Sequence, residues 1–280
     1  MPDWNRIFPD ADHRWIMGLR RSDSAVDFFA DVDATGATRR EKAAWLADEP
    51  HKYAILLPEA EPALNETIEL ARAWGANPDA QIDDDPFAGL LRLGRAWEPD
   101  FVWMHPATDG LHHLIGGVVC FPSVWALTDK VGRPMSFVHE PVPELNPSIG
   151  RQIELFLRNQ DPGVVWLREN WSLSRESWLN QHTSRSRRRL DETVGVDDVW
   201  FRLEHQLLLK LPQSGSILFG IRVEVVPFRA VVENKLAAPR FARLLSTMSP
   251  TAASYKDILT VRPALLKMLT SSPRPSNDDR

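Results

Sequence analysis

The chain has 280 residues, of which 43% are hydrophobic and 25% are charged, so it can bury a sizeable core as one large domain or two smaller ones. A net charge of −5 is too small to indicate nucleic acid or an anionic membrane surface as a partner. A single cysteine excludes an internal disulfide framework, and it also excludes an iron–sulfur cluster or a structural zinc site held by four thiolates.

The sequence shows no targeting or membrane-spanning pattern. No run approaches the roughly 18 consecutive apolar residues of a membrane span. Residues 1–6 lack the apolar region of a signal peptide. We therefore expect a cytoplasmic protein with no membrane partner.

The first part of the chain, to about residue 95, is expected to be helical. Residues 24–29 and 38–47 are rich in helix-forming side chains. Residues 59–74 place apolar side chains at helical spacing. We expect these helices to form an N-terminal extension of a sheet domain.

The pattern changes to strands and turns from residue 115 onward. Residues 115–121 predict a short strand, and residues 129–134 predict a turn. Asn146 as N-cap, followed by Pro147 at the first helical position, predicts a helix over 146–159. Residues 163–173 predict a further strand by alternation. The polar face of this strand is expected to carry Trp166, Arg168, Asn170 and Ser172.

The strongest supersecondary signal is a hairpin. Residues 199–211 alternate between apolar and polar side chains, 212–216 predict a turn, and 217–226 predict the returning strand. If the register is even, Arg222 lies on the same face as Glu204.

The C-terminal part is again helical, with helices expected over 237–246 and 263–269. Residues 271–280 are polar and are expected to form a disordered tail. No internal repeat and no strong linker divides the sequence. We therefore predict one α+β domain over 1–270, built around a single antiparallel sheet with helical N-terminal and C-terminal extensions.

One histidine is a candidate ligand. The segment 136–143, Ser-Phe-Val-His-Glu-Pro-Val-Pro, places His139 in an apolar stretch that ends in two prolines. Because proline fixes its own φ and favours extended geometry in the residue before it, we expect this segment to be extended and stiff. A stiffly held imidazole suits an axial metal ligand. The alternative is a core histidine that is hydrogen-bonded to a backbone carbonyl.

Several catalytic motifs are absent. The sequence has no Gly-x-Gly-x-x-Gly, no Walker-type loop, no His-Glu-x-x-His and no Gly-x-Ser-x-Gly elbow. His112 and His113 are adjacent, so on a strand they would point to opposite faces and not share a metal. Composition and spacing alone therefore indicate an α+β protein with a polar strand face and one well-supported histidine.

Several segments taken together resemble the haem-dependent oxidative N-demethylase alpha-subunit-like family. Their order and approximate spacing fit over residues 13–226, most of the chain, although no single motif is decisive. The segments are WIMGLR (15–20), CFPSVW (120–125), DKVG (129–132), VHEPVP (138–143), RENWSL (168–173), and the pair RLEHQ (202–206) and LPQSGSILFGIR (211–222).

The resemblance implies a PAS-like sheet that binds haem b. It implies a monooxygenase that uses O2 to remove a methyl group from a small secondary or methylated amine and releases formaldehyde. Members of this kind draw electrons from a separate flavin and iron–sulfur reductase subunit, and a chain with one cysteine needs such a partner. The alternatives are a haem-binding PAS-like sensor or carrier without turnover, and a binding protein that has lost the haem.

The resemblance also implies which residues hold the haem. His139 matches the family's His-x-Pro-Val-Pro segment, so it is expected to be the proximal ligand of the iron. Arg168 and Arg202 are expected to pair with the haem propionates. Trp171, together with Trp125 and Trp166, is expected to line the porphyrin, and the alternative for each of them is ordinary core packing.

Glu204 and Arg222 are the expected catalytic residues. Glu204 is expected to hold a cationic amine or to pass protons to bound oxygen, and Arg222 to assist it or to pair with a propionate. The alternative is a structural arginine–glutamate network inside the sheet. His205, Leu207 and Glu224 depart from the family's pattern. His205 and Leu207 are expected to change packing, whereas Glu224 is expected to reshape the substrate end, so the resemblance does not carry dimethylamine over as the substrate. The arginine-rich run at 185–189 is a candidate docking surface for an acidic partner.

Overall fold

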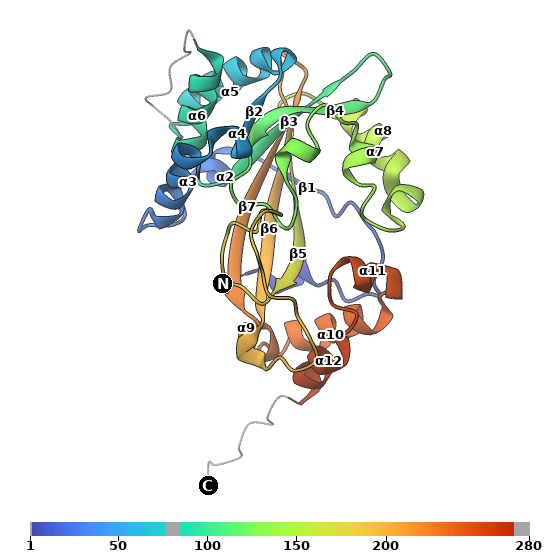
Figure 1. The fold of residues 1–280 in the computed structure, drawn as a ribbon. Coiled ribbons are helices and arrows are strands. Elements are labelled where there is room, and N and C mark those ends of the chain that lie inside the picture. Colours follow the sequence, from blue (N-terminus) through green and yellow to red (C-terminus); the bar gives the residue numbers. More distant parts are fainter. Residues whose placement is uncertain (1, 77–84, 272–280) are drawn as a thin grey trace.

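The computed structural model describes residues 2–76 and 85–271, and in these ranges helices pack around one open sheet (Figure 1). Within the described ranges the sheet has seven strands in the order β1-β5-β6-β7-β3-β4-β2, and all neighbouring pairs are antiparallel. The strands are β1 (Arg20–Ser22), β2 (Ala54–Leu56), β3 (Asp100–Pro106), β4 (His112–Val118), β5 (Val165–Ser174), β6 (Trp200–Lys210) and β7 (Ile217–Pro227). This confirms the α+β class.

Helices lie at both ends of the sheet (Figure 1). The α-helices are α1 (Trp4–Ile7), α2 (Val26–Phe29), α3 (Ala37–Asp48), α4 (Pro50–Tyr53), α5 (Glu61–Ala73), α6 (Pro86–Ala96), α7 (Met135–Val138), α8 (Arg151–Asn159), α9 (Arg229–Val232), α10 (Ala237–Thr247), α11 (Pro250–Tyr255) and α12 (Arg262–Thr270). None of the helices in residues 2–76 and 85–271 has the length and apolar character needed to cross a bilayer.

The N-terminal part matches the sequence prediction only partly. The expected helices over 38–47 and 59–74 correspond to α3 and α5, the first predicted from its helix-forming side chains and the second from its apolar spacing. However, this part also supplies β1 and β2, the two edge strands of the sheet. Each edge strand has three residues, too few for a periodic pattern to reveal it. The N-terminal part is therefore built into the sheet and is not a separate helical extension.

The β6–β7 hairpin has the predicted strands but not the even register. Leu211 joins the turn, where its N–H donates to Ser216 O at 2.8 Å, so the pairing starts at Lys210 with Ile217. A shift of one residue moves every side chain to the other face. The assignment of Arg222 to the face of Glu204 was therefore wrong.

The register defines two faces of the central strands, because directly opposed residues of an antiparallel pair point the same way. What we call the Glu204 face carries Arg168, Asn170, Arg202, Glu204, Gln206, Ile221 and Val223. What we call the His205 face carries Glu169, Trp171, Leu203, His205, Arg222 and Glu224. The predicted alternation of β5 and β6 is confirmed.

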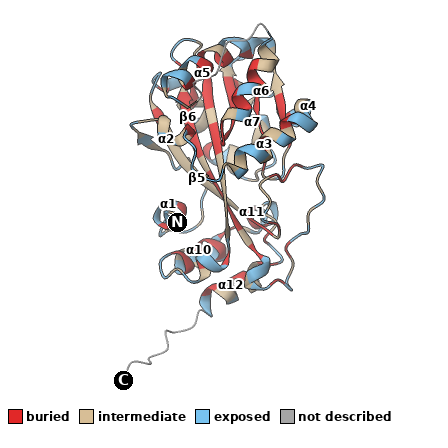
Figure 2. Cartoon of the chain, turned by 90° about the vertical axis from the view of Figure 1, so that its left-hand side faces the viewer, coloured by how far each residue is buried: buried red, intermediate tan, exposed pale blue. Residues whose placement is uncertain are grey.

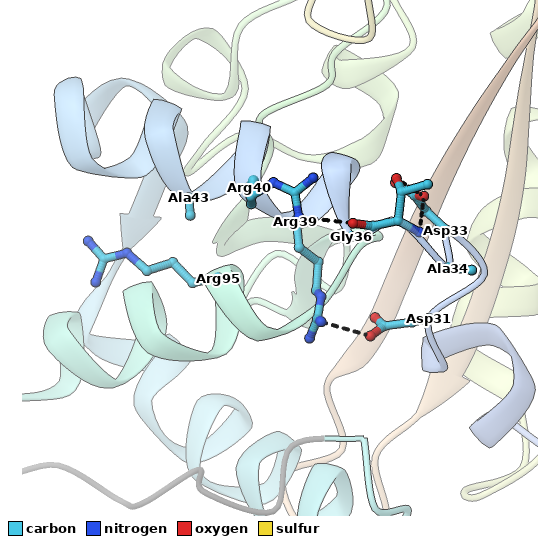
Figure 3. Close-up of a pocket in the computed structure, with 9 residues that line it drawn as sticks. Asp31, Asp33, Ala34, Gly36, Arg39, Arg40, Ala43 and Arg95 are labelled. Atoms are coloured by element: carbon cyan, nitrogen blue, oxygen red, sulfur yellow. Dashed lines mark hydrogen bonds and ion pairs between the residues drawn. The ribbon is translucent and has the colours of Figure 1, made fainter.

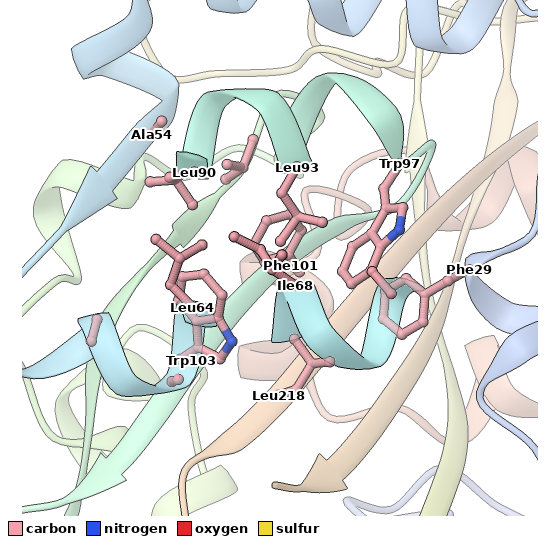
Figure 4. Close-up of a cluster of buried hydrophobic side chains, with 14 of the residues drawn as sticks. Phe29, Ala54, Leu64, Ile68, Leu90, Leu93, Trp97, Phe101, Trp103 and Leu218 are labelled. Carbon is pink, nitrogen blue, oxygen red and sulfur yellow. The ribbon is translucent and has the colours of Figure 1, made fainter. Parts of the chain in front are cut away.

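Two apolar cores cover the His205 face, one at each end of the sheet. In the first, α5 and α6 pack on Phe101 and Trp103 of β3, and Phe29 stacks near Trp97 (Figure 4). In the second, α10 and α12 pack on Phe201 of β6 through residues such as Phe241. Figure 2 shows buried residues concentrated along the sheet and exposed residues on the outer sides of helices such as α3 and α4. These cores fix the sheet and leave its other face available for a site.

The Glu204 face is covered differently. At one end α8 packs its apolar side against β6 and β5, with Leu157 and Phe156 near Leu208 and Trp166. The segment that links β4 to α8 contains α7 and passes over the same face.

The His139 segment is not extended. Residues 135–138 form the short helix α7, and His139 follows it with helical backbone angles, φ −90° and ψ −5°. The physical reason is that a proline restricts only the residue directly before it, here Glu140 and Val142, and not His139. The predicted N-cap role of Asn146 was also wrong, because its side-chain amide donates to Ser136 O at 2.7 Å and a π-helical turn precedes α8. Of the expected tail, residues 272–280 lie outside the described residues.

Candidate functional site

Glu204 lies in β6 and is buried, with 9% of its surface exposed. Its carboxylate accepts hydrogen bonds from three side chains: the hydroxyl of Ser123, the amide of Asn170 at 3.3 Å and the amide of Gln206 at 2.8 Å. The two amides belong to the Glu204 face, whereas Ser123 comes from the loop after β4. A carboxylate held by three donors keeps one orientation, which suits a group that binds a cation or handles a proton.

Arg202 is fully buried on the same strand. Its Nε donates to Ser123 Oγ at 2.8 Å, its Nη1 to Trp178 O at 3.1 Å and its Nη2 to Phe121 O at 2.6 Å. Burial lowers the pKa of Arg202 to about 10, while the charge of Glu204 opposes this effect. Because its donors hold these loop groups, the arrangement favours a positioning role for Arg202 over the expected pairing with a propionate.

Arg168 lies on β5, opposite Gln206 in the register. Its Nε is buried without a hydrogen-bond partner, and its guanidinium forms no ion pair with the described residues. Burial lowers the pKa of Arg168, against the opposing charges of Glu204 and Glu169. A buried guanidinium in this state is suited to an anionic group such as a carboxylate. This placement agrees with the expected role in holding a haem propionate.

The imidazole of His139 is half-buried, and no residue of the described ranges forms a hydrogen bond with it. Its pKa is lowered to about 4, first by burial and then by the positive charges of Arg168 and Lys130. The imidazole is therefore neutral at pH 7, with a nitrogen lone pair available. The sequence-based alternative, a histidine satisfied by a backbone carbonyl, is not what the described residues show.

Two contacts hold the His139 segment in place. The Nζ of Lys130 donates to Val138 O at 3.1 Å, and Glu144, which has a left-handed φ of 65°, accepts hydrogen bonds from Ser249 and Thr251 at the start of α11. The segment is thus tied to the loop before it and to a helix from the C-terminal part of the chain. These contacts, and not an extended geometry imposed by the prolines, hold the segment in position.

Lys256 joins the cluster from the end of α11. Its Nζ donates to Trp171 O at 2.8 Å, and its charge acts on both Glu204 and Arg168. Burial lowers the pKa of Lys256 to about 8. Sequence reasoning missed this residue because no local pattern links it to β6. It missed Ser123 as a site residue although CFPSVW is one of the segments that carry the resemblance.

Trp171 and Arg222 lie on the His205 face, and Trp171 meets the cluster through Lys256, whose Nζ lies 4.2 Å from the centroid of its ring. Trp171 stacks on Phe201 with ring centroids 5.7 Å apart, within the second core. Arg222 pairs with the buried Glu98 and donates to Phe28 O at 2.5 Å. The structure therefore brings together His139, Arg168, Arg202 and Glu204, but not Trp171 or Arg222.

Two of the three departures from the family's pattern, His205 and Glu224, meet on that same face. His205 Nε2 and the Glu224 carboxylate lie 3.2 Å apart, and the pairing with His205 lowers the pKa of Glu224. The two unusual residues thus compensate each other within the sheet. They do not reach the Glu204 face.

Two surface clefts also occur in the described part of the chain. One of about 470 Å³ lies at the start of α3 and is lined by residues that include Asp31, Arg39 and Arg95 (Figure 3). The other, of about 610 Å³, lies between residues 13–17, Glu144 and the α10–α11 junction. Neither cleft is lined by a predicted site residue.

The Glu204 face fits a haem group by two observations. It combines the unpartnered guanidinium of Arg168 with apolar side chains of β7, Ile221 and Val223, as a ligand with an apolar ring and anionic arms requires. His139 offers a neutral imidazole. The described residues contain no group of three or more His, Cys, Asp or Glu side chains that could hold a bare metal ion. Haem does not need such a group, because many haem proteins supply the iron with a single axial ligand.

The family model described as haem-dependent oxidative N-demethylase, alpha subunit-like, matches residues 72–266, which is more than half of the chain. The matched span contains every residue of the cluster around Glu204, and it contains His139 and α11.

Proposed function

We propose that this chain, which belongs to the haem-dependent oxidative N-demethylase alpha-subunit-like family, binds haem b and oxidatively removes a methyl group from a small secondary or methylated amine. The observation that carries the proposal is the neutral, unpartnered imidazole of His139 within electrostatic reach of the unpartnered guanidinium of Arg168. Together these groups offer one axial ligand and one anion-binding group.

In this proposal His139 is the axial ligand, and Arg168 pairs with a propionate. Bound haem supplies the iron that carries out the oxygen chemistry. Burial, and after it the positive charge of Arg168, lowers the pKa of His139, so the ligand is unprotonated and ready at neutral pH. Arg202 acts one step back, by fixing Ser123.

Glu204 is proposed to hold the amine or its proton. Its carboxylate is buried, and negatively charged groups of this kind attract an ammonium ion when they are desolvated. The cation of Lys256 lies near enough to act on Glu204, so it balances part of the negative charge when no amine is bound. A proton leaving the amine would pass to a carboxylate oxygen of Glu204.

The overall reaction requires outside reductant. One oxygen atom of O2 ends in formaldehyde and the other in water, so each turnover consumes two electrons and two protons. We propose that a flavin and iron–sulfur reductase subunit supplies the electrons. The run at 185–189 is a poor docking surface for it, because Arg187 and Arg189 pair with Asp257 and Arg188 pairs with Glu176.

We also propose that the sheet is PAS-like. Counted from β3, the five longer strands lie in the order 2-1-5-4-3, so the first and last of them are neighbours in the middle of the sheet. This is the order expected of a PAS-like sheet. A PAS-like sheet carries its ligand on one face. This supports the haem site, which we propose to lie on the Glu204 face.

The test separates the enzyme from a haem sensor or carrier. Protein purified with haem is mixed with dimethylamine, O2 and a reductase system, and formaldehyde is measured. Release of formaldehyde in proportion to amine consumed supports the demethylase. A protein that binds haem and carbon monoxide but oxidises no methylated amine is a sensor or carrier, which contradicts the proposal.

A further inference from the structure

The amide of Gln206 has one satisfied and one unsatisfied end. Its Nε2 donates to Glu204 Oε2 at 2.8 Å, while its Oε1 is buried and has no hydrogen-bond partner among the described residues. Gln206 itself is 7% exposed. A carboxylate can only accept hydrogen bonds, so Glu204 forces the nitrogen of the amide toward itself and turns the oxygen away. The hydrogen bond to Glu204 therefore decides which end of the Gln206 amide is the nitrogen and which is the oxygen.

Glu204 also retains capacity to accept. A carboxylate has about four lone-pair sites, and Ser123, Asn170 and Gln206 use three of them. The Glu204 face thus presents two neighbouring acceptors, one charged and one neutral. A buried carbonyl oxygen without a donor is unfavourable, and that of Gln206 belongs to an amide bound to a buried carboxylate with a free acceptor site, which points to a ligand that supplies donors to both.

We propose that Gln206 is a specificity-determining residue, whose Oε1 and the Glu204 carboxylate together bind the two N–H groups of a protonated secondary amine. This inference rests on the proposed function and adds to it a residue and a selection rule. A secondary ammonium ion has two N–H donors, a tertiary one has one, and a quaternary one has none. A tertiary amine would leave the oxygen of Gln206 unsatisfied.

The test measures equilibrium binding rather than turnover. Haem-loaded protein without reductant is titrated with dimethylammonium chloride and with trimethylammonium chloride, and binding is followed by calorimetry. The wild-type protein is expected to bind dimethylammonium about tenfold more tightly, since an unsatisfied buried acceptor penalises the analogue. In Gln206→Leu the preference is expected to disappear, with the two affinities within about twofold, because the second N–H of dimethylammonium then has no acceptor and no buried amide oxygen remains for trimethylammonium to leave unsatisfied.

A matched control is available in Gln160. It is a buried glutamine, 5% exposed, whose amide atoms also lack partners among the described residues, but it lies at the end of α8. Gln160→Leu should retain the wild-type preference. Gln206→Met, which keeps the side-chain length, repeats the test if Gln206→Leu does not fold.

The outcomes are distinct. Equal affinities in the Gln206 variants, with the preference kept in Gln160→Leu, support the inference. A preference that persists in the Gln206 variants, or wild-type protein that binds neither amine, overturns it. Neither of these results affects a haem spectrum that responds to carbon monoxide, so the haem part of the proposed function is judged separately.

Discussion

The hydroxyl of Ser123 donates a hydrogen bond to the carboxylate of Glu204, and Arg202 donates to the same hydroxyl from the neighbouring side. The loop after β4 is thereby fastened to the polar face of β6. Asp100 holds the other side of this loop, accepting hydrogen bonds from the N–H groups of Cys120 at 3.0 Å and Phe121 at 2.6 Å. The carboxylate of Glu204 is therefore oriented by a chain of contacts that crosses from the loop into the sheet.

Ser123→Ala tests this orientation. We expect it to lower the rate of formaldehyde release about tenfold or more, because a hydrogen bond to a charged group contributes about 1.5–3 kcal/mol. Haem content should not change, since the hydroxyl of Ser123 bonds to Glu204 and Arg202 and, in the described part of the chain, forms no hydrogen bond with His139 or Arg168. Ser123→Thr keeps the hydroxyl and should retain most of the activity. Equal activity in the alanine and wild-type proteins would show that Ser123 does not position Glu204.

Substitution by methionine should affect the free energy of unfolding strongly at Arg202 and only slightly at Arg168. Arg202→Met is expected to lower the free energy of unfolding by about 3 kcal/mol or more, because it strands buried carbonyls and leaves Glu204 less compensated. Arg168→Met should leave the unfolding of the haem-free protein within about 1 kcal/mol of wild type, because its Nε has no partner to lose.

Haem binding should separate the same two variants. Titration with haemin is expected to show weaker binding by about tenfold in Arg168→Met, from the loss of one charge-assisted pair. Folded Arg202→Met should bind haem as the wild type does. Denaturant titration and haemin titration on both variants measure the two effects. If Arg202→Met lost haem without losing stability, the role of Arg202 would be that of a propionate ligand.

Arg222→Met addresses the other face of the sheet. We expect lower stability, because the substitution leaves the buried carboxylate of Glu98 without its cation. The haem spectrum and the activity per folded molecule should stay as in the wild type. Loss of formaldehyde release from a stable, fully haem-loaded Arg222→Met protein would restore the catalytic role expected from the sequence.

Lys256 predicts a pH dependence of stability. Its folded pKa of about 8 lies below the ordinary value of a lysine, so between about pH 8 and pH 10.4 the unfolded chain binds more protons than the folded one. Stability therefore rises with pH in this window. Relative to Lys256→Met, the wild-type protein should gain unfolding free energy from pH 8 to pH 10, measured by urea titration at each pH. A constant difference across the window would contradict the lowered pKa.

Much of the fold could be predicted from sequence because it depends on local patterns. The alternation of β5 and β6 and the helical spacing of α5 each lie within a single segment, and the structure confirms them. The face of Arg222 could not be obtained in this way. It depends on whether Leu211 lies opposite Ile217 or opposite Ser216. The hydrogen bond from the N–H of Leu211 to Ser216 O decides for Ser216 and sets the register of the hairpin.

The candidate site was less predictable than the fold. The resemblance made His139, already a candidate from its own segment, the expected iron ligand, and it singled out Glu204, since a lone histidine or glutamate carries little information. Lys256 comes from a helix far along the chain, and the roles of Gln206 and Arg168 depend on which of their atoms lack partners. Such properties arise only when strands and loops are packed together.

The most direct test of the haem site is the absorption spectrum of haem-loaded wild-type and His139→Ala protein, oxidised and then reduced under carbon monoxide. We expect the wild-type protein to show a Soret band near about 400 nm that shifts with carbon monoxide, as one protein ligand leaves the other side of the iron open. His139→Ala should lose haem or show a clearly altered band. Wild-type protein that remains colourless with added haemin, or a His139→Ala protein with full haem and an unchanged spectrum, would contradict His139 as the iron ligand.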